Sequence, residues 1–247
     1  MGKRRSGLVA VIAFCSLAWG QGRSQPGELM DGGKERHDRT RITWGAKLPT
    51  PPEDGQPRLK DAQGNRPRPL LICVRADYDT QDQQRFDLAV EAVDNFQLAT
   101  RFFDCAEINE SAAKKAPLLE GLNFKAPSLI IFNAELTKRA VARGRAGVMK
   151  GYSLMRQLGQ PTYKTLIRKT LTEAKKLLGQ FDQVDAARDA LAIKTRRYET
   201  ALSKGQNAKA ETLKRSIDKD QAEIDKLYAE SQAAWTELWK LQFADPK

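Results

Sequence analysis

The sequence predicts an α/β domain, in which helices flank a central mixed sheet, followed by a C-terminal antiparallel helical hairpin. Three observations lead to this fold class. Residues 70–74 form a continuous apolar run, which is typical of a strand buried on both faces of a sheet. Strand-like and helix-like segments alternate over residues 69–178. Beyond Pro161, apolar residues recur at alternating spacings of four and three, as in the seam of a coiled coil.

Residues 1–20 are predicted to be a cleavable signal peptide. Residues 3–5 are basic, residues 8–19 are apolar, and Ala18 and Gly20 are small residues at the −3 and −1 positions of a cleavage site. About 12 apolar residues are too few to span a bilayer core of ~30 Å. We therefore expect a secreted or periplasmic protein that is not an integral membrane protein.

Residues 21–68 are rich in proline, glycine and charged side chains, a composition typical of an irregular segment. We predict a flexible tether. Within it, Arg41–Trp44 has two open interpretations: a short edge strand, or a segment that docks Trp44 on the main domain.

The predicted domain, residues 69–178, begins with the strand at Leu70–Val74. Apolar residues at helical spacing predict a helix over Gln83–Leu98. The segment Arg101–Cys105 is predicted to be a second strand, parallel to the first, because a helix connects the two. A short helix is expected over Ser111–Glu120.

A third strand is predicted over Ala126–Asn133. It opens with Pro127, and a proline is tolerated at the start of a strand because its missing N–H lies at the end of the ladder. A hairpin would pair this strand with Lys138–Arg143. Three glycines that follow, at 144, 147 and 151, predict a loop.

The C-terminal region, residues 179–247, is predicted to be the hairpin. One long helix over Thr162–Ser203 would run out of the domain, turn at Gly205 and Asn207, and return along a similar seam. Residues 181–247 contain twelve basic and twelve acidic residues, so this region has no net charge. Neutrality favours a structural arm that packs on the domain, on a partner or on a second copy.

Charge and composition exclude several classes of protein. The 247 residues carry a formal net charge of +11. Eleven basic residues and one acidic residue fall within 138–176, which predicts either a surface for an anionic partner or a solvated helical face. Nucleic acid is not an expected partner, because the chain is predicted to be exported and the basic residues lack the aromatic interleaving of a base-stacking surface.

Few residues are available for metal or histidine chemistry. Three cysteines and a single histidine, His37, are too few for a Cys/His zinc site or a disulfide-rich scaffold. Catalysis by a Ser-His-Asp or Cys-His arrangement is not expected, and neither is a metal or a cofactor.

Three features of residues 69–178 resemble the thioredoxin family. A buried strand leads through a short turn into a helix, as that family's strand leads into its Trp-Cys-x-x-Cys turn. The second strand ends in an acidic and polar segment, 104–109, and Ala126–Phe132 looks like the family's cis-proline loop and its following strand. The resemblance covers about 110 of the 247 residues and implies a thioredoxin-like fold.

The chain departs from that family at the reactive turn, where Tyr78 is followed by Asp79-Thr80-Gln81-Asp82. Thioredoxin chemistry needs a thiolate at a helix N-terminus, where the helix dipole and backbone N–H groups lower its pKa. An aspartate is also stabilised there as an anion, but it cannot attack a disulfide. If the alignment holds, dithiol exchange at this turn is excluded.

The resemblance also implies a way of binding. In thioredoxin-like domains the cis-proline loop presents its backbone to an extended peptide, which pairs with it as an added strand. The matching residues form the candidate docking surface, which comprises Tyr78, Asp79, Thr80, Asp82, Ala126 and Pro127.

Three aspartates, Asp77, Asp79 and Asp82, crowd one loop at the end of a strand, where α/β proteins place functional groups. Their spacing does not fit an EF-hand, which needs glycine at the sixth position and glutamate at the twelfth. It also does not fit a phosphatase of the strand-Asp-x-Asp-x-Thr type, because Thr80 comes one position early. The favoured interpretation is capping and solvation of the helix start, and a weak, incidental cation site is the alternative.

Two cysteines, Cys73 and Cys105, lie in neighbouring predicted strands. They either approach within disulfide range or serve as two buried thiols that behave as small apolar residues. We expect an exported, redox-inactive protein that binds a protein partner and acts as a scaffold module in the cell envelope. The alternatives are a thiol-disulfide oxidoreductase using Cys73 or Cys105, and a binder of anionic envelope polymer through 138–176.

Overall fold

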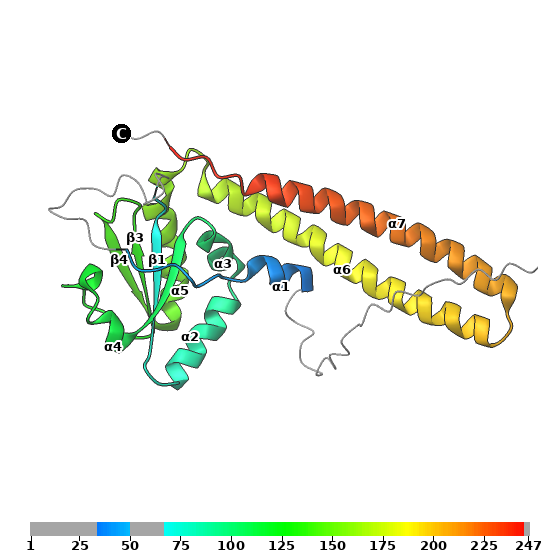
Figure 1. The fold of residues 1–247 in the computed structure, drawn as a ribbon, viewed down its shortest axis with the longest axis horizontal. Helices are drawn as coiled ribbons and strands as arrows, with labels where there is room; N and C mark the ends of the chain where they lie inside the picture. Colours follow the sequence, from blue (N-terminus) through cyan, green and yellow to red (C-terminus); the bar gives the residue numbers. More distant parts are fainter. Residues whose placement is uncertain (1–33, 50–66, 245–247) are drawn as a thin grey trace, which may run out of the picture. The chain divides into compact units, whose positions relative to one another are not determined.

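The computed structural model describes residues 34–49 and 67–244, so the predicted signal peptide lies outside the described residues. All described residues belong to one compact unit. They form seven α-helices and a four-stranded mixed sheet, and the predicted α/β class with a long C-terminal helical region is confirmed (Figure 1).

The sheet has the strand order β2-β1-β3-β4. Its strands are β1 (Leu70–Arg75), β2 (Asp104–Asn109), β3 (Ser128–Phe132) and β4 (Arg139–Arg143). The central strand β1 runs parallel to β2 and antiparallel to β3, and β3 pairs with β4 as the predicted hairpin.

Both faces of the sheet are covered, which explains the continuous apolar runs of β1 and β3. Leu71 and Cys73 of β1 face a core built with the helices, whereas Leu70, Ile72 and Val74 face a smaller core on the other side. Since successive strand residues point to opposite faces, an apolar residue is needed at every position.

The helix predicted over Gln83–Leu98 is two helices, α2 (Gln81–Glu91) and α3 (Asp94–Thr100). Val93 lies outside helical geometry, and the amide of Gln97 donates to the Glu91 carbonyl at 3.0 Å. This break lets five consecutive residues, 96–100, become buried, which a single amphipathic helix cannot do.

The second strand was predicted too early in the chain. The backbone N–H groups of Arg101, Phe102 and Phe103 bond to carbonyls of residues 98–100, so these residues extend the turn after α3. The ladder begins only at Asp104, whose N–H donates to Pro69 at 2.9 Å. The helix predicted over Ser111–Glu120 is likewise reduced to α4 (Glu110–Ala113) and the 3₁₀ turn η2 (Pro117–Leu119), because Pro117 interrupts it.

The loop predicted from three glycines is wrong, because Gly144–Gly159 is helix α5. Its glycines allow α5 to lie against the sheet. A Cβ at Gly147 would lie 2.8 Å from the carbonyl carbon of Ala142, and one at Gly151 would lie 2.8 Å from the Leu129 Cδ1 atom. At positions 147 and 151, glycine therefore indicates close packing and not a break in structure.

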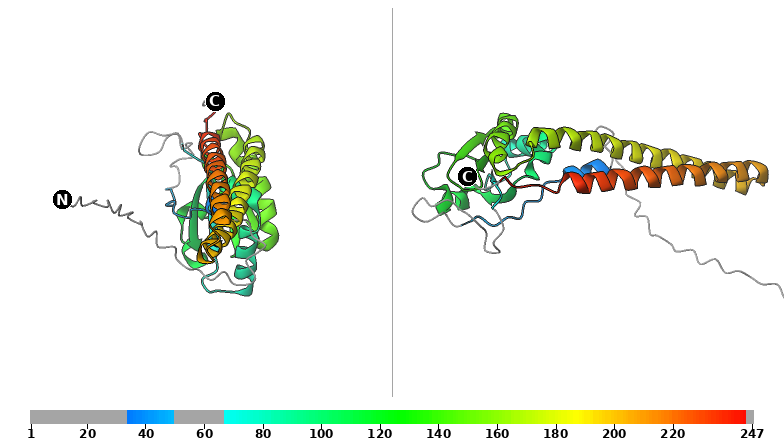
Figure 2. Two further views of the ribbon diagram at one scale, coloured as in Figure 1. Left: turned by 90° about the vertical axis from the view of Figure 1, so that its right-hand side faces the viewer. Right: turned by 90° about the horizontal axis from the view of Figure 1, so that it is seen from above.

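The hairpin consists of α6 (Ile167–Ser203) and α7 (Asn207–Leu238), which lie side by side in Figures 1 and 2. Near the turn the seam differs from the predicted one. Leu202, which the four-and-three spacing places in the seam, is 48% exposed, and the helices approach through Ala201 and Ala210 instead. Asp220, a polar residue that the same spacing places in the seam of the return helix, forms an ion pair with Lys194.

The segment predicted as tether is partly structured, since Lys34–Thr40 is helix α1. Arg36 pairs with Asp94 at 2.7 Å and with Asp182 at 2.5 Å, so α1 bridges α3 and α6. Trp44 packs against the larger core, in agreement with the docking interpretation of Arg41–Trp44. The next two residues, 45 and 46, donate backbone hydrogen bonds to the carbonyl of Cys105 at the edge of β2.

A row of aromatic rings attaches the hairpin to the domain. Neighbouring rings lie 5.3–6.0 Å apart, from Phe181 through Trp235 and Trp239 to Phe102 and Tyr163. The C-terminal segment completes the junction through an isolated antiparallel β-bridge between Tyr163 and Phe243.

Replacing the glycines of the helices with alanine tests their different roles. Gly147→Ala should lower the free energy of unfolding by about 1–3 kcal/mol, because the new Cβ would clash with the backbone of Ala142. Gly179→Ala should raise it by up to about 1 kcal/mol, because Gly179 lies within α6 with no heavy atom within 4 Å of its Cβ position. Urea unfolding measures both; equal effects would contradict the packing assigned to α5.

A second prediction concerns acid stability. Burial raises the pKa of Glu35, but hydrogen bonds from Arg188 and Arg39 outweigh it, so the pKa lies below its ordinary value of 4.5. The ionised carboxylate therefore stabilises the folded state at neutral pH, and this contribution is lost as the pH falls through the folded-state pKa.

Thermal unfolding followed from about pH 6 to pH 3 should show a smaller acid-induced loss of stability in Glu35→Gln than in the original sequence. Glu223→Gln, a change at an exposed position of α7, is the matched control and should keep the original pH dependence. Identical profiles for both variants would show that α1 is not held by this carboxylate.

Candidate functional site

The candidate docking surface lies at one end of the sheet, where β1 leads into α2 and the chain enters β3 (Figure 1). Val74 is paired with Ser128. Continuing this antiparallel register places Pro127 opposite Arg75, and the Tyr78–Asp82 segment begins three residues later. The six predicted residues are therefore at the same end of the sheet.

The start of α2 is built by local hydrogen bonds. Thr80 is the N-cap, and its hydroxyl accepts from the backbone N–H of Gln83 at 3.1 Å. The buried side chain of Gln83 accepts from the N–H of Ala76 at 2.9 Å and donates to Asp87 at 2.9 Å. The cap and this amide together fix the direction in which the loop leaves β1.

The outward-facing side chains of the loop are one aromatic ring and carboxylates. Tyr78 is 84% exposed, the highest value among the large hydrophobic side chains of the described residues. Asp79 and Asp82 are exposed, and Asp79 accepts a hydrogen bond from Gln84 at 2.9 Å. Negative charge is favourable at this helix N-terminus, so the loop presents a stable anionic surface.

Asp77 ties this loop to the end of β2. Its carboxylate accepts from the hydroxyl of Ser111 at 2.8 Å and from the backbone N–H of Ser111 at 3.1 Å. These two hydrogen bonds lower the pKa of Asp77 below its ordinary value. Asp77 is therefore occupied by a structural contact, unlike Asp82.

The backbone of Ala126 makes only one weak hydrogen bond with the described residues. The Ala126–Pro127 peptide bond is cis. The Ala126 N–H contacts a carboxylate oxygen of Glu110 at the long distance of 3.4 Å, and its carbonyl accepts no hydrogen bond from any described residue. By contrast, the carbonyl of Pro127, a buried residue, accepts from Gly144 at 2.9 Å.

The two cysteines of the sheet lie away from this surface. Cys105 is paired with Leu71, so Cys73 lies two positions further along the ladder. Both thiols are free and buried. Burial raises the pKa of each to about 12. A thiolate is the reactive form of cysteine, so neither side chain is suited to disulfide exchange at neutral pH.

The basic residues of 138–176 do not form one cluster on one element. They are distributed over β4, α5, the first turns of α6 and the segments that precede β4 and α6. Arg139 and Arg143 lie on the edge strand and donate to backbone carbonyls of residues 120 and 123. Positive charge on an edge strand also opposes pairing with another sheet.

Among the residues that the structure describes, no three or more His, Cys, Asp or Glu side chains are arranged to hold a metal ion. In the same ranges, no helix is both long and apolar enough to cross a bilayer.

Three residues that shape the surface were not predicted from the sequence, namely Gln83, Glu110 and Ser111. The spacing of Thr80 and Gln83 matches the Ser/Thr-x-x-Glu/Gln pattern of a capped helix start, so a signal for this amide was present. Glu110 and Ser111 reach the surface through tertiary contacts with residues distant in the sequence, for which no local pattern exists.

Comparison with protein-family models, with curated proteins and with solved structures finds no match to this chain.

Burial of both thiols gives a direct prediction. In the folded mature chain, Cys73 and Cys105 should not react with a thiol reagent at pH 8, because on the order of one thiol in ten thousand would be ionised. In denaturant both should react. If a thiol reacts in the folded protein, and this reaction disappears in Cys73→Ser or Cys105→Ser, the result would instead favour the oxidoreductase alternative.

Proposed function

We propose that this protein is a redox-inactive thioredoxin-like module that binds an extended segment of a protein partner at the candidate docking surface. The order β2-β1-β3-β4, with one parallel and two antiparallel pairings and a proline before β3, supports the thioredoxin-like assignment. The N-terminal features of residues 1–20 support export, and a scaffold role in the cell envelope follows from export and binding together.

One observation carries the binding proposal. Ala126 offers a weakly held N–H and a carbonyl that no described residue hydrogen-bonds, at the same end of the sheet as the exposed ring of Tyr78. An extended peptide can pair with this backbone as a short added strand while its side chains contact the ring and the carboxylates. Because Asp79 and Asp82 are exposed and acidic, basic side chains suit this peptide best.

Redox catalysis is the less supported alternative. The turn into α2 holds Asp79 and Thr80 where a dithiol protein needs cysteine, and the two described thiols are buried with a raised pKa. With no low-pKa thiol at the surface, the module would hold a partner without exchanging electrons with it.

Binding of the full chain to immobilised peptides of random sequence tests the proposal. The peptides that bind the chain should be enriched in lysine and arginine. Tyr78→Ala should weaken their binding by at least about ten-fold, because exposed aromatic residues dominate such contacts. Asp79→Asn with Asp82→Asn should remove the preference for basic peptides.

Leu88→Ala is the matched control, since Leu88 is also a large exposed residue of the same region, at 65%. It should leave peptide affinity unchanged within about two-fold. The proposal is wrong if the original chain binds no peptide, or if Tyr78→Ala and Leu88→Ala change peptide affinity to the same extent. Reduction of insulin disulfides by the original chain would exclude the redox-inactive assignment.

A further inference from the structure

The neutral hairpin has a strong internal separation of charge. Its outer part, residues 193–215, contains seven basic and two acidic residues. The remaining hairpin residues, 181–192 and 216–244, contain four basic and nine acidic ones. The positive charge is thus gathered at the end where α6 turns into α7, away from the sheet (Figure 1).

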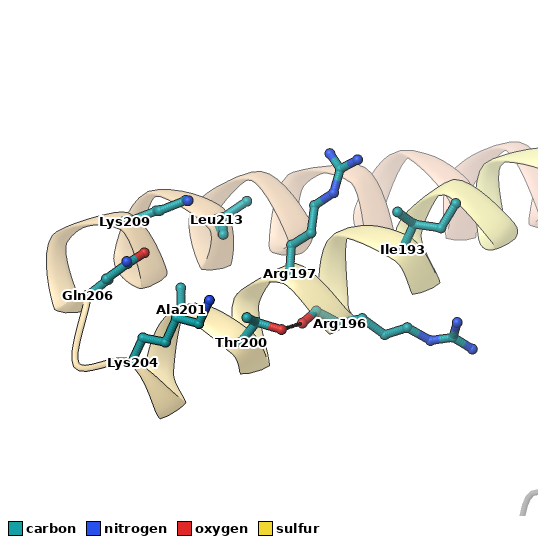
Figure 3. Close-up of a pocket in the computed structure, with 9 residues that line it drawn as sticks. All are labelled: Ile193, Arg196, Arg197, Thr200, Ala201, Lys204, Gln206, Lys209 and Leu213. Carbon is teal, nitrogen blue, oxygen red and sulfur yellow. Dashed lines mark hydrogen bonds between the residues drawn. The ribbon is translucent and has the colours of Figure 1, made fainter.

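A groove of about 670 Å³ opens between the two helices at this end. Ile193, Ala201 and Leu213 supply its apolar surface. Polar and cationic side chains surround them, as Figure 3 shows. These are Arg196, Arg197, Thr200, Lys204, Gln206 and Lys209.

The four cations of the groove have no ion-pair partner among the described residues. Other cations of the outer part are paired, since Lys194 pairs with Asp220 and Arg215 pairs with Glu211 at 2.6 Å. In Figure 3 the side chains of Arg196 and Arg197 point in different directions. A single compact anion needs convergent donors, so this arrangement suits negative charge spread over a surface.

Large aliphatic side chains are exposed among these cations. Ile193 is 52% exposed, and Leu202, at the turn, is 48% exposed. Aliphatic side chains beside lysine and arginine are the combination that binds the interface of a bilayer, where apolar groups reach below the headgroups. A soluble polyanion would leave both side chains in water.

We propose that the hairpin tip, residues 193–213, docks on a membrane surface that carries anionic phospholipid. Arg196, Arg197, Lys204 and Lys209 would contact the headgroups, and Leu202 would enter the interface. Each basic residue near an anionic surface improves partitioning by about five-fold, so four of them are sufficient for reversible binding. The hairpin would thus hold the sheet and its docking surface at a distance from the bilayer.

Co-sedimentation of the full chain with vesicles tests this contact. The chain should bind vesicles of phosphatidylglycerol and phosphatidylcholine more strongly than vesicles of phosphatidylcholine alone, and added salt should reduce the difference. The predicted N-terminal apolar segment is common to all variants and to both vesicle types, so the difference between vesicles is the quantity to compare.

Changing Arg196, Arg197, Lys204 and Lys209 to glutamine should lower this preference by at least about 100-fold, and Leu202→Ser should lower it further. The control removes the same charge from exposed positions of the domain, as Lys150, Arg168, Lys169 and Lys175 to glutamine, and should retain the preference. Peptide binding at the sheet should be unchanged in the tip variant, so the two proposals fail separately.

Three results would overturn the assignment. The original chain could bind both vesicle types equally. The tip and control variants could lose binding to the same extent, which would indicate that binding depends on net charge alone and not on the tip. Soluble inorganic polyphosphate could also bind at the tip while anionic vesicles do not, which would make the groove a site for a soluble anion.

Discussion

The attachment of a long helical pair to a small sheet depends on one stacked junction. Two arginines lie between its aromatic rings: the guanidinium of Arg39 is 3.5 Å from the centre of Phe181, and that of Arg101 is 5.2 Å from both Trp235 and Trp239. Aromatic pairs contribute about 0.5–1.5 kcal/mol each beyond their buried area, and desolvated cation–π contacts about 2 kcal/mol. Burial lowers the pKa of the half-buried Arg101.

This junction joins segments that are far apart in the chain. Helix α1 contributes Arg39, the turn after α3 contributes Arg101 and the ring of Phe102, and the hairpin contributes the rings of Phe181 and Trp235. Since each segment stacks on the next, the hairpin is attached at its base and its outer half has no such support. The buried residues of the outer half are small, as at Ala201 and Ala210, so the tip remains slender and its polar groups face solvent. A rigid base with a charged end is an arrangement suited to reaching a second surface.

The candidate docking surface was predictable in location but not in detail. Continuous apolar strands and the proline before β3 placed Tyr78, Asp79 and Pro127 at one end of the sheet, because strand order follows from burial and connection length. The contacts that define the surface, in contrast, join residues that are distant in the sequence. Asp77 is bound by Ser111, and the N–H of Ala126 is only loosely held by Glu110. These distances depend on how α4 packs across the strand ends, which no local pattern records.

The sequence alone determined the element types, since hydrophobic periodicity reports which face of a strand or helix is buried. It predicted β1, the β3–β4 hairpin and the long C-terminal helices, and the lack of cysteine beside Tyr78 limited the chemistry. The tertiary structure decided what depends on close approach. Gly147 and Gly151 lie in helix α5, where the lack of a side chain lets the helix pack tightly against Ala142 and Leu129. A sequence pattern cannot distinguish glycines in that role from glycines in a loop. Only the fold gathers the unpaired cations of α6 and α7 around one groove, because a helix–turn–helix brings together residues from both sides of the turn.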